Sequence, residues 1–169
     1  MRCFIALALP AGDSLRNALA ECKQRGKAVD PNNLHLTLKF LGEINDSEKV
    51  GNALEGIKFN KFSITVRGMG AFPTPQRGRV LFVKAYPEEV LGRLADEINR
   101  MTKEVPLDHP FTPHITLVRA RDWRNFSDLI SKYENTVFLE REINSFSLFE
   151  STLTPTGPIY KEIRKFQLI

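Results

Sequence analysis

A short pattern of histidine, any residue, threonine and leucine occurs twice in this chain, at 35–38 and at 114–117. Each copy lies in a segment where apolar and polar residues alternate, which is typical of a strand with one buried face. The strand period of two places the histidine and the threonine of each copy on the same side of the strand. Any fold of this chain must therefore accommodate two similar polar strand faces, whose histidines lie 79 residues apart in the sequence.

The elements around the two motifs also repeat in order. Apolar spacing of three and four residues predicts helices over 14–25, with Gly26 as C-cap, over 47–57 and 88–101, and an amphipathic stretch over 126–133. Apolar runs and alternation predict strands over 3–9, 34–41, 62–66, 80–85, 114–119, 137–141, 146–151 and 159–168. The glycine- and proline-rich segment 68–77 predicts a loop.

From this order we expect an α+β fold with two pseudo-symmetric lobes. Each lobe is expected to be a small, mostly antiparallel sheet with outer helices, and the two sheets are expected to face each other across a central groove. A length of 169 residues with 42% hydrophobic and 26% charged residues fits one compact domain, 1–169.

Composition also narrows the cellular setting. No apolar run approaches the ~20 residues that cross a bilayer, so we expect no membrane association. Two cysteines, Cys3 and Cys22, cannot form a disulfide framework for a chain of this length, which favours a cytoplasmic protein. The net charge of +4 favours anionic partners weakly. We expect a monomer.

If the two polar strand faces meet, His35, Thr37, His114 and Thr116 converge on one groove. Such a set suits displacement at phosphorus, in which one imidazole removes a proton from the nucleophile and the other protonates the departing oxygen. The threonine hydroxyls can donate hydrogen bonds to phosphate oxygens, and a guanidinium can bind them in a bidentate fork. Arg119 is the candidate guanidinium, although it reaches the groove only where its strand ends or bulges.

Lys39 is expected on the same strand face as His35, and we interpret it as a solvated charge or an ion pair at the strand end. Phe72, Phe111 and Trp123 are candidates for stacking on a base, but aromatic side chains are mostly buried, so we do not place them in the site.

Other reaction classes lack their motifs. A zinc hydrolase needs three or four protein ligands, and no HExxH, no cysteine pair and no acidic residue close to either histidine motif completes such a set, so no metal site is expected. It has no GxSxG, and Gly68-Met69-Gly70 continues into neither a dinucleotide fingerprint nor a P-loop. We expect no cofactor.

At these residues the sequence resembles the 2H phosphoesterase superfamily, and within it the RNA 2′,3′-cyclic phosphodiesterases, also called 2′-5′ RNA ligases. Two histidine motifs with matching flanks and in this order are far more specific than one. The segments that carry the resemblance are 2–6, 33–43, 72–73, 79–81, 111–117, 151–153 and 157–160.

The resemblance implies metal-independent hydrolysis of an RNA 2′,3′-cyclic phosphate end to a 2′-phosphate. It implies that His35 is the general acid for O3′ and His114 the general base for water, with Thr37, Thr116 and Arg119 holding the phosphate. It also implies a ligation that joins such an end to a 5′-hydroxyl through a 2′-5′ bond, without ATP.

Two alternatives remain open from the sequence. The same catalytic residues could serve a phosphodiesterase that acts on small cyclic nucleotides, because only the surrounding loops would differ. The basic charge and a polar groove would also suit a non-catalytic module that binds RNA ends.

Overall fold

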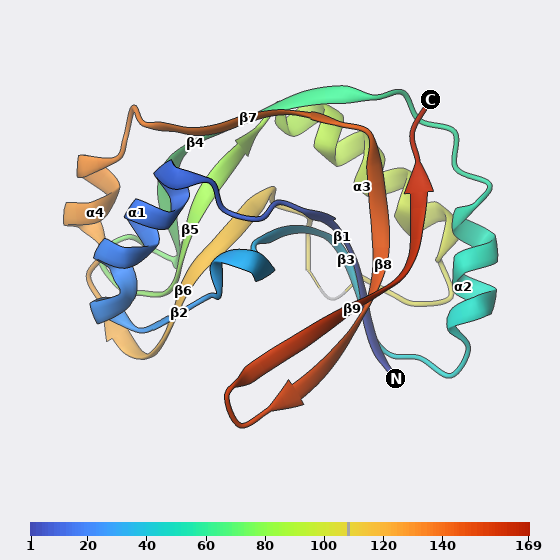
Figure 1. Cartoon of the computed structure of the whole chain (residues 1–169), viewed down its shortest axis with the longest axis horizontal. Helices are drawn as coiled ribbons and strands as arrows, with labels where there is room; N and C mark the ends of the chain where they lie inside the picture. Colours follow the sequence, from blue (N-terminus) through green and yellow to red (C-terminus); the bar gives the residue numbers. More distant parts are fainter. Residues whose placement is uncertain (108) are drawn as a thin grey trace.

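The computed structural model describes residues 1–107 and 109–169 and forms an α+β fold (Figure 1). Its strands are β1 (Arg2–Ala8), β2 (Lys27–Ala28), β3 (His35–Glu43), β4 (Phe62–Pro73), β5 (Gly78–Tyr86), β6 (His114–Arg124), β7 (Val137–Ile143), β8 (Ser145–Thr154) and β9 (Gly157–Gln167). Its helices are α1 (Asp13–Cys22), α2 (Ser47–Leu54), α3 (Glu88–Met101) and α4 (Ser127–Lys132), with 3₁₀ turns η1 (Lys23–Arg25) and η2 (Pro31–Asn33).

The strands form one continuous antiparallel sheet and not the two separate sheets expected from the repeat. Its order is β7-β4-β5-β6-β3-β1-β8-β9, and the short strand β2 pairs with β6. The two halves, β7-β4-β5-β6 and β3-β1-β8-β9, join through a single residue pair, Leu36 with Ile115. The two lobes are therefore halves of one curled sheet, and the two histidine motifs lie on the adjacent strands where the halves meet.

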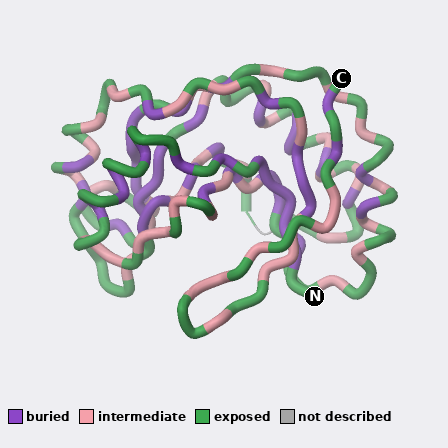
Figure 2. Tube along the Cα trace, in the orientation of Figure 1, coloured by how far each residue is buried: buried purple, intermediate pink, exposed green. Residues whose placement is uncertain are grey.

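Helices cover each half of the sheet on its outer side (Figure 1). Helices α1 and α4 pack near β4, β6 and β7, whereas α3 packs on β3 and β5 and is flanked by α2. The buried segments follow the sheet strands and the inner sides of these helices (Figure 2). The apolar spacing in the sequence correctly predicted the helices, because each helix buries one stripe, such as Leu91, Leu94 and Ile98 in α3.

Strand β4 continues to Pro73, so the loop expected over 68–77 is much shorter. Gly70 pairs with Phe82 on β5, and a Cβ atom at Gly70 would lie 2.6 Å from Cζ of Phe82. The glycine therefore makes room for the Phe82 ring within a regular ladder and does not mark a loop.

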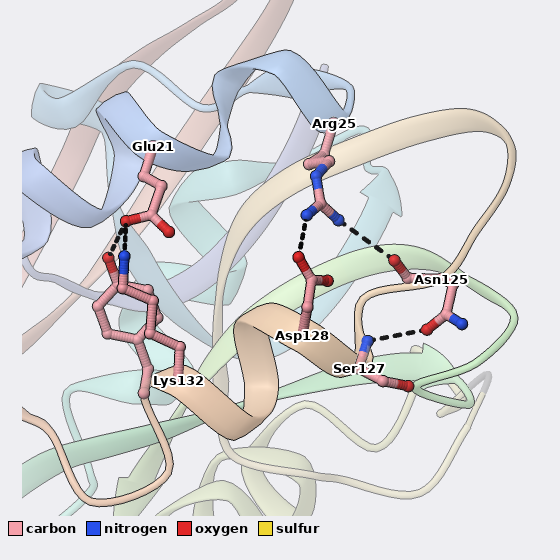
Figure 3. Close-up of polar contacts among 7 residues, drawn as sticks. Glu21, Arg25, Asn125, Ser127, Asp128 and Lys132 are labelled. Atoms are coloured by element: carbon pink, nitrogen blue, oxygen red, sulfur yellow. Dashed lines mark hydrogen bonds and ion pairs between the residues drawn. The ribbon is translucent and has the colours of Figure 1, made fainter.

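Helix α1 ends earlier than expected, at Cys22, and Gly26 has an extended backbone. A Cβ atom at Gly26 would lie 2.7 Å from the carbonyl oxygen of Arg119, so only glycine lets β2 approach β6 this closely. Arg25 next to it donates to Asp128 and to the Asn125 carbonyl, which fixes η1 against α4 (Figure 3). These contacts join the segment before β2 to α4.

The last two strands extend beyond the rest of the sheet as a two-stranded ribbon (Figure 1). We call residues 151–160 the arm. It has no buried residue, and Leu153 and Ile159 are among the most exposed large apolar side chains (Figure 2). In the described part of the chain, no helix is long and apolar enough to cross a membrane.

Candidate active site

The strand pairing brings the two histidine motifs together. Because Leu36 pairs with Ile115 in an antiparallel ladder, His35 lies opposite Thr116 and Thr37 lies opposite His114. Leu36 and Ile115 are fully buried, so these four polar residues share the other, accessible face. His35 and His114 are then diagonal neighbours, a relationship that places residues about 7–8 Å apart in a sheet.

Each histidine is held by a hydrogen bond to the backbone two residues earlier. Nδ1 of His35 lies 2.8 Å from the Asn33 carbonyl oxygen, and Nδ1 of His114 lies 2.7 Å from that of Thr112. A carbonyl oxygen only accepts, so Nδ1 carries the proton in both rings. Nε2 of each ring is therefore the atom available to a ligand.

Aromatic rings pack on both imidazoles in a similar way. The ring of His35 lies 5.0 Å from Phe4 and 5.2 Å from Tyr160 between centroids. The ring of His114 lies 5.0 Å from Phe72 and 5.4 Å from Phe82. These contacts restrict the rotamers of both rings, so the direction of each Nε2 is set before a substrate arrives.

A one-residue bulge lies at the last position of each motif. On β3, Ala6 pairs with Thr37 and Ile5 with Lys39, which leaves Leu38 as the extra residue. On β6, Phe82 pairs with Thr116 and Leu81 with Val118, which leaves Leu117 as the extra residue. A bulge reverses the alternation of the residues that follow it.

Arg119 can reach the groove only where its strand ends or bulges, and β6 bulges at Leu117. Val118 becomes buried, while Arg119 is exposed and lines the same groove as His35 and Thr116. The matching bulge on β3 turns Phe40 to that groove, where its side chain is 44% exposed.

The interpretation of Lys39 as a solvated charge or an ion pair was wrong, because the bulge buries this residue. Lys39 is 3% exposed, and its Nζ donates to the Asn99 side chain, to both oxygens of Thr102 and to the Val105 carbonyl. These acceptors include the C-terminal end of α3, which favours a positive charge. Burial lowers the pKa of this ammonium.

Burial lowers the pKa of both catalytic candidates. The main cause for His35 and for His114 is desolvation, which disfavours the imidazolium form. The positive charge of Arg119 lowers both pKa values further, and the two carbonyl hydrogen bonds act in the opposite direction. Arg119 is thus electrostatically coupled to both rings.

A large groove opens on the His35 side, with a volume of about 1020 Å³. One wall is formed by β2 and the residues up to Asn33, and the other wall is the arm. The Asn33 side chain donates to the Pro158 carbonyl and so ties the two walls together at one point. Three cations line the groove, Arg2, Lys27 and Arg119, against one carboxylate, Asp30.

A much smaller pocket lies on the His114 side, with a volume of about 40 Å³. Thr37, Phe40, Phe111, Thr112 and His114 are among the residues that line it. It has room for water but not for a nucleotide. The two histidines therefore face spaces of very different size.

Of the three aromatic stacking candidates, Phe72 packs on His114, Phe111 lines the small pocket, and Trp123 lies away from both cavities at the end of β6.

Sequence reasoning missed Tyr160 of the arm and Lys84 of β5, which pairs directly with His114 and is exposed. The alternation of strand 80–85 would have placed Lys84 beside Phe82 on one face, but only the β5–β6 register brings that face to His114.

Within residues 1–107 and 109–169, no three histidine, cysteine, aspartate or glutamate side chains are grouped so that they could hold a metal ion. Both cysteines are buried, and burial raises the pKa of the Cys22 thiol to about 11. The polar groups nearest the two imidazoles include the threonine hydroxyls, the Arg119 guanidinium, the Lys84 ammonium and the Tyr160 phenol.

The chain is similar to known proteins over nearly its whole length. A curated protein of Archaeoglobus fulgidus, named RNA 2′,3′-cyclic phosphodiesterase, is 35% identical over 99% of this chain and 100% of its own length. One of Aquifex aeolicus with the same name is 36% identical over 88% of this chain and 85% of its own. The crystal structure of TT0787 of Thermus thermophilus matches with a TM-score of 0.77 and 35% identity, covering 99% of this chain and 97% of that one. Residues 11–154 match the 2′-5′ RNA ligase superfamily, and the chain belongs to that family.

Proposed function

We propose that this protein hydrolyses the 2′,3′-cyclic phosphate at an RNA end to a 2′-phosphate, with His35 as general acid and His114 as general base. The observation that carries the proposal is the pair of imidazoles on adjacent strands, each with Nδ1 bound to a carbonyl oxygen, so that Nε2 is the atom that can exchange a proton with a substrate. The name shared by the curated relatives supports the same reaction.

The reaction needs only these two proton transfers. Nε2 of neutral His114 takes a proton from water while the water oxygen bonds to phosphorus. The bond from phosphorus to O3′ breaks as Nε2 of protonated His35 gives its proton to O3′. The products are a 3′-hydroxyl and a 2′-phosphate, and solvent then returns the proton from His114 to His35. Each transfer contributes about 10²- to 10⁴-fold in rate.

The unequal cavities support this assignment of acid and base. The leaving O3′ belongs to the terminal ribose, so the acid must lie on the side where the RNA is bound. The groove of about 1020 Å³ beside His35 is large enough for a nucleotide, and the pocket of about 40 Å³ beside His114 fits the attacking water. His35 is then on the RNA side and His114 on the water side.

Three further residues are assigned to the phosphate. Arg119 offers a bidentate fork to its non-bridging oxygens, and the hydroxyls of Thr37 and Thr116 can donate one hydrogen bond each. The two threonines lie on different sides, because Thr37 lines the small pocket and Thr116 the large groove. Such donors stabilise the charge that accumulates on phosphorus oxygens in the transition state.

The same residues support 2′-5′ ligation when a 5′-hydroxyl takes the place of water. His114 then deprotonates that hydroxyl, and the bond from phosphorus to O3′ breaks as before. The pocket of about 40 Å³ beside His114 has room for a water or for the 5′-hydroxyl of such an acceptor.

The decisive experiment is mass analysis of the product from a defined RNA with a 2′,3′-cyclic end, with the position of the phosphate resolved. We expect a gain of one water and a 2′-phosphate. A 3′-phosphate would mean that O2′, and not O3′, is the leaving oxygen. Binding of the RNA without conversion would mean that the protein is a non-catalytic module that binds RNA ends. Equal kcat/KM on a cyclic mononucleotide and on RNA would favour a phosphodiesterase for small nucleotides.

A further inference from the structure

An exposed aromatic residue with two arginines lies beyond the groove. Trp123, near the end of β6, is 44% exposed, and the guanidinium carbons of Arg77 and Arg79 lie 4.8 Å and 4.4 Å from its ring centroid. Arg79 belongs to β5, and Arg77 to the turn before it. We call these three side chains the Arg-Trp cluster. It takes no part in the site described above.

The basic charge of the chain is concentrated at this end of the sheet. Segments 74–79 and 119–124 contain five arginines and one aspartate, an excess equal to the net charge of +4 of the whole chain. Arg25 nearby is paired with Asp128 (Figure 3). Among the described residues, by contrast, no carboxylate lies within ion-pair distance of Arg77 or Arg79.

A structural role explains only part of this arrangement. Cation–π contacts at exposed rings are weak, and here two positive charges that repel each other share one exposed ring. An anion bound between the guanidiniums would relieve that repulsion, and the exposed part of the ring can contact a flat, apolar group. Phosphodiesters and nucleobases combine these two properties.

The position of the cluster connects it to the groove. Strand β6 carries Arg119 in the groove and Trp123 four residues later, within an irregular stretch in which Arg119 pairs with Val80 and Arg124 with Gly78. Lys27 pairs with Arg119 and lines the groove at the same level. An RNA strand that leaves the groove past Lys27 therefore passes over positively charged side chains on its way to the Arg-Trp cluster.

We propose that the Arg-Trp cluster binds the body of a single-stranded RNA, one or more nucleotides upstream of the end that reacts. Arg77 and Arg79 hold backbone phosphates, and Trp123 stacks on a base. This inference rests on the proposed function, because it takes the groove to hold the terminal nucleotide. It predicts that the enzyme distinguishes long RNA from cyclic mononucleotides through contacts outside the groove.

Steady-state kinetics on two substrates test the proposal. For an RNA of about eight nucleotides with a cyclic end, Trp123→Ala and the double variant Arg77→Gln/Arg79→Gln are expected to raise KM about 5-fold or more and leave kcat unchanged. The double variant should also reduce the slope of log KM against log salt by about 1.4, because two phosphate contacts are lost and each contributes ~0.7. KM for a cyclic mononucleotide should not change.

The matched control is Arg93→Gln. Arg93 also lies over an aromatic ring, that of Phe59, but on α3 and outside the residues that line the groove. It should leave both substrates unaffected. The proposal is overturned if KM for the long RNA is unchanged in the cluster variants, or if both substrates change equally.

A binding measurement separates this proposal from the catalytic one. Trp123 is the only tryptophan in the chain, so its fluorescence reports on the cluster. Titration of the wild type with an unreactive RNA of eight nucleotides ending in a 3′-hydroxyl should quench this fluorescence saturably, and a mononucleotide should not. Absence of hydrolysis with quenching present refutes the proposed function alone, whereas hydrolysis without quenching refutes the role of the cluster.

Discussion

Phe40 and Arg119 occupy equivalent positions in the two halves of the sheet. Each follows its motif histidine by five residues, and a single extra residue, Leu38 or Leu117, turns each side chain onto the groove face. One half thus contributes a guanidinium and the other a phenyl ring. The chemical asymmetry of the site arises from these two positions, because the histidines and threonines are duplicated.

The Phe40 ring lies beside both cavities and is suited to contact the nucleoside next to the phosphate. We expect Phe40→Ala to raise KM about 5-fold or more with little effect on kcat, since stacking contributes about 1–3 kcal/mol per base. Because the ring is 44% exposed, the melting temperature should hardly change. Phe40→Trp should retain the wild-type KM, and an unchanged KM in the alanine variant would exclude Phe40 from the substrate site.

Arg119 combines a positive charge with a bidentate geometry, and two substitutions separate them. Arg119→Lys keeps the charge and loses the fork, so kcat/KM should fall at least about 10-fold without a shift of the pH profile. Arg119→Gln removes the charge that lowers the pKa of both histidines, so the pKa values should rise and the profile should move to higher pH. Identical profiles for the two variants would contradict this coupling.

The buried Lys39 is expected to be a structural residue. Lys39→Met removes the donor from four acceptors and leaves several of them unsatisfied, which should reduce the free energy of unfolding by about 2–4 kcal/mol. Urea denaturation measures this loss. Lys58→Met, at an exposed lysine, is the control and should change stability little.

Most of the element order could be predicted from the sequence, because each helix buries one stripe and each strand is either an apolar run, as β1 is, or alternates over part of its length. The convergence of His35 and His114 also followed from the repeat, given only that the two strands meet. That they meet as neighbours in one sheet depends on a single pair of buried residues, Leu36 and Ile115, which have no distinctive composition. One continuous sheet could not be distinguished from two by periodicity alone.

The two bulges limit in a different way what the sequence can predict, because they change which strand face a residue is on. Strict alternation placed Lys39 on the groove face and Arg119 away from it, and both placements reverse for the same reason. Phosphate binding by Arg119 requires a bulge in its strand, so the sequence predicts that bulge conditionally. Nothing comparable in the sequence indicates the bulge in β3. Since the halves are related, a bulge in one strand is evidence for a bulge in the other.

Tyr160 links the arm to the general acid. Its ring lies edge-on to His35 and not to His114, so Tyr160→Leu should affect the acid selectively. We expect kcat on an RNA cyclic phosphate to fall about 10-fold, while turnover of an aryl phosphodiester, whose phenolate needs no proton to leave, should be retained. Tyr160→Phe keeps the ring and is expected to behave as the wild type. An equal loss on both substrates would indicate general damage to the groove.

The pH dependence of the reaction tests the assignment of both histidines. In the free protein, burial lowers the pKa of His35 and of His114 below the ordinary 6.5. The base must be neutral and the acid protonated, so kcat/KM should follow a bell whose limbs both lie below pH 6.5. A bound cyclic phosphate is an anion that stabilises the imidazolium form, so the alkaline limb of kcat should lie at higher pH than that of kcat/KM.

Substitution of each histidine assigns the two limbs. His35→Ala should abolish the alkaline limb and His114→Ala the acidic limb, each with a loss of about 10²-fold or more in kcat. In the wild type the two limbs report the constants of the coupled pair. An alkaline limb that survives in His35→Ala would assign the acid to another residue.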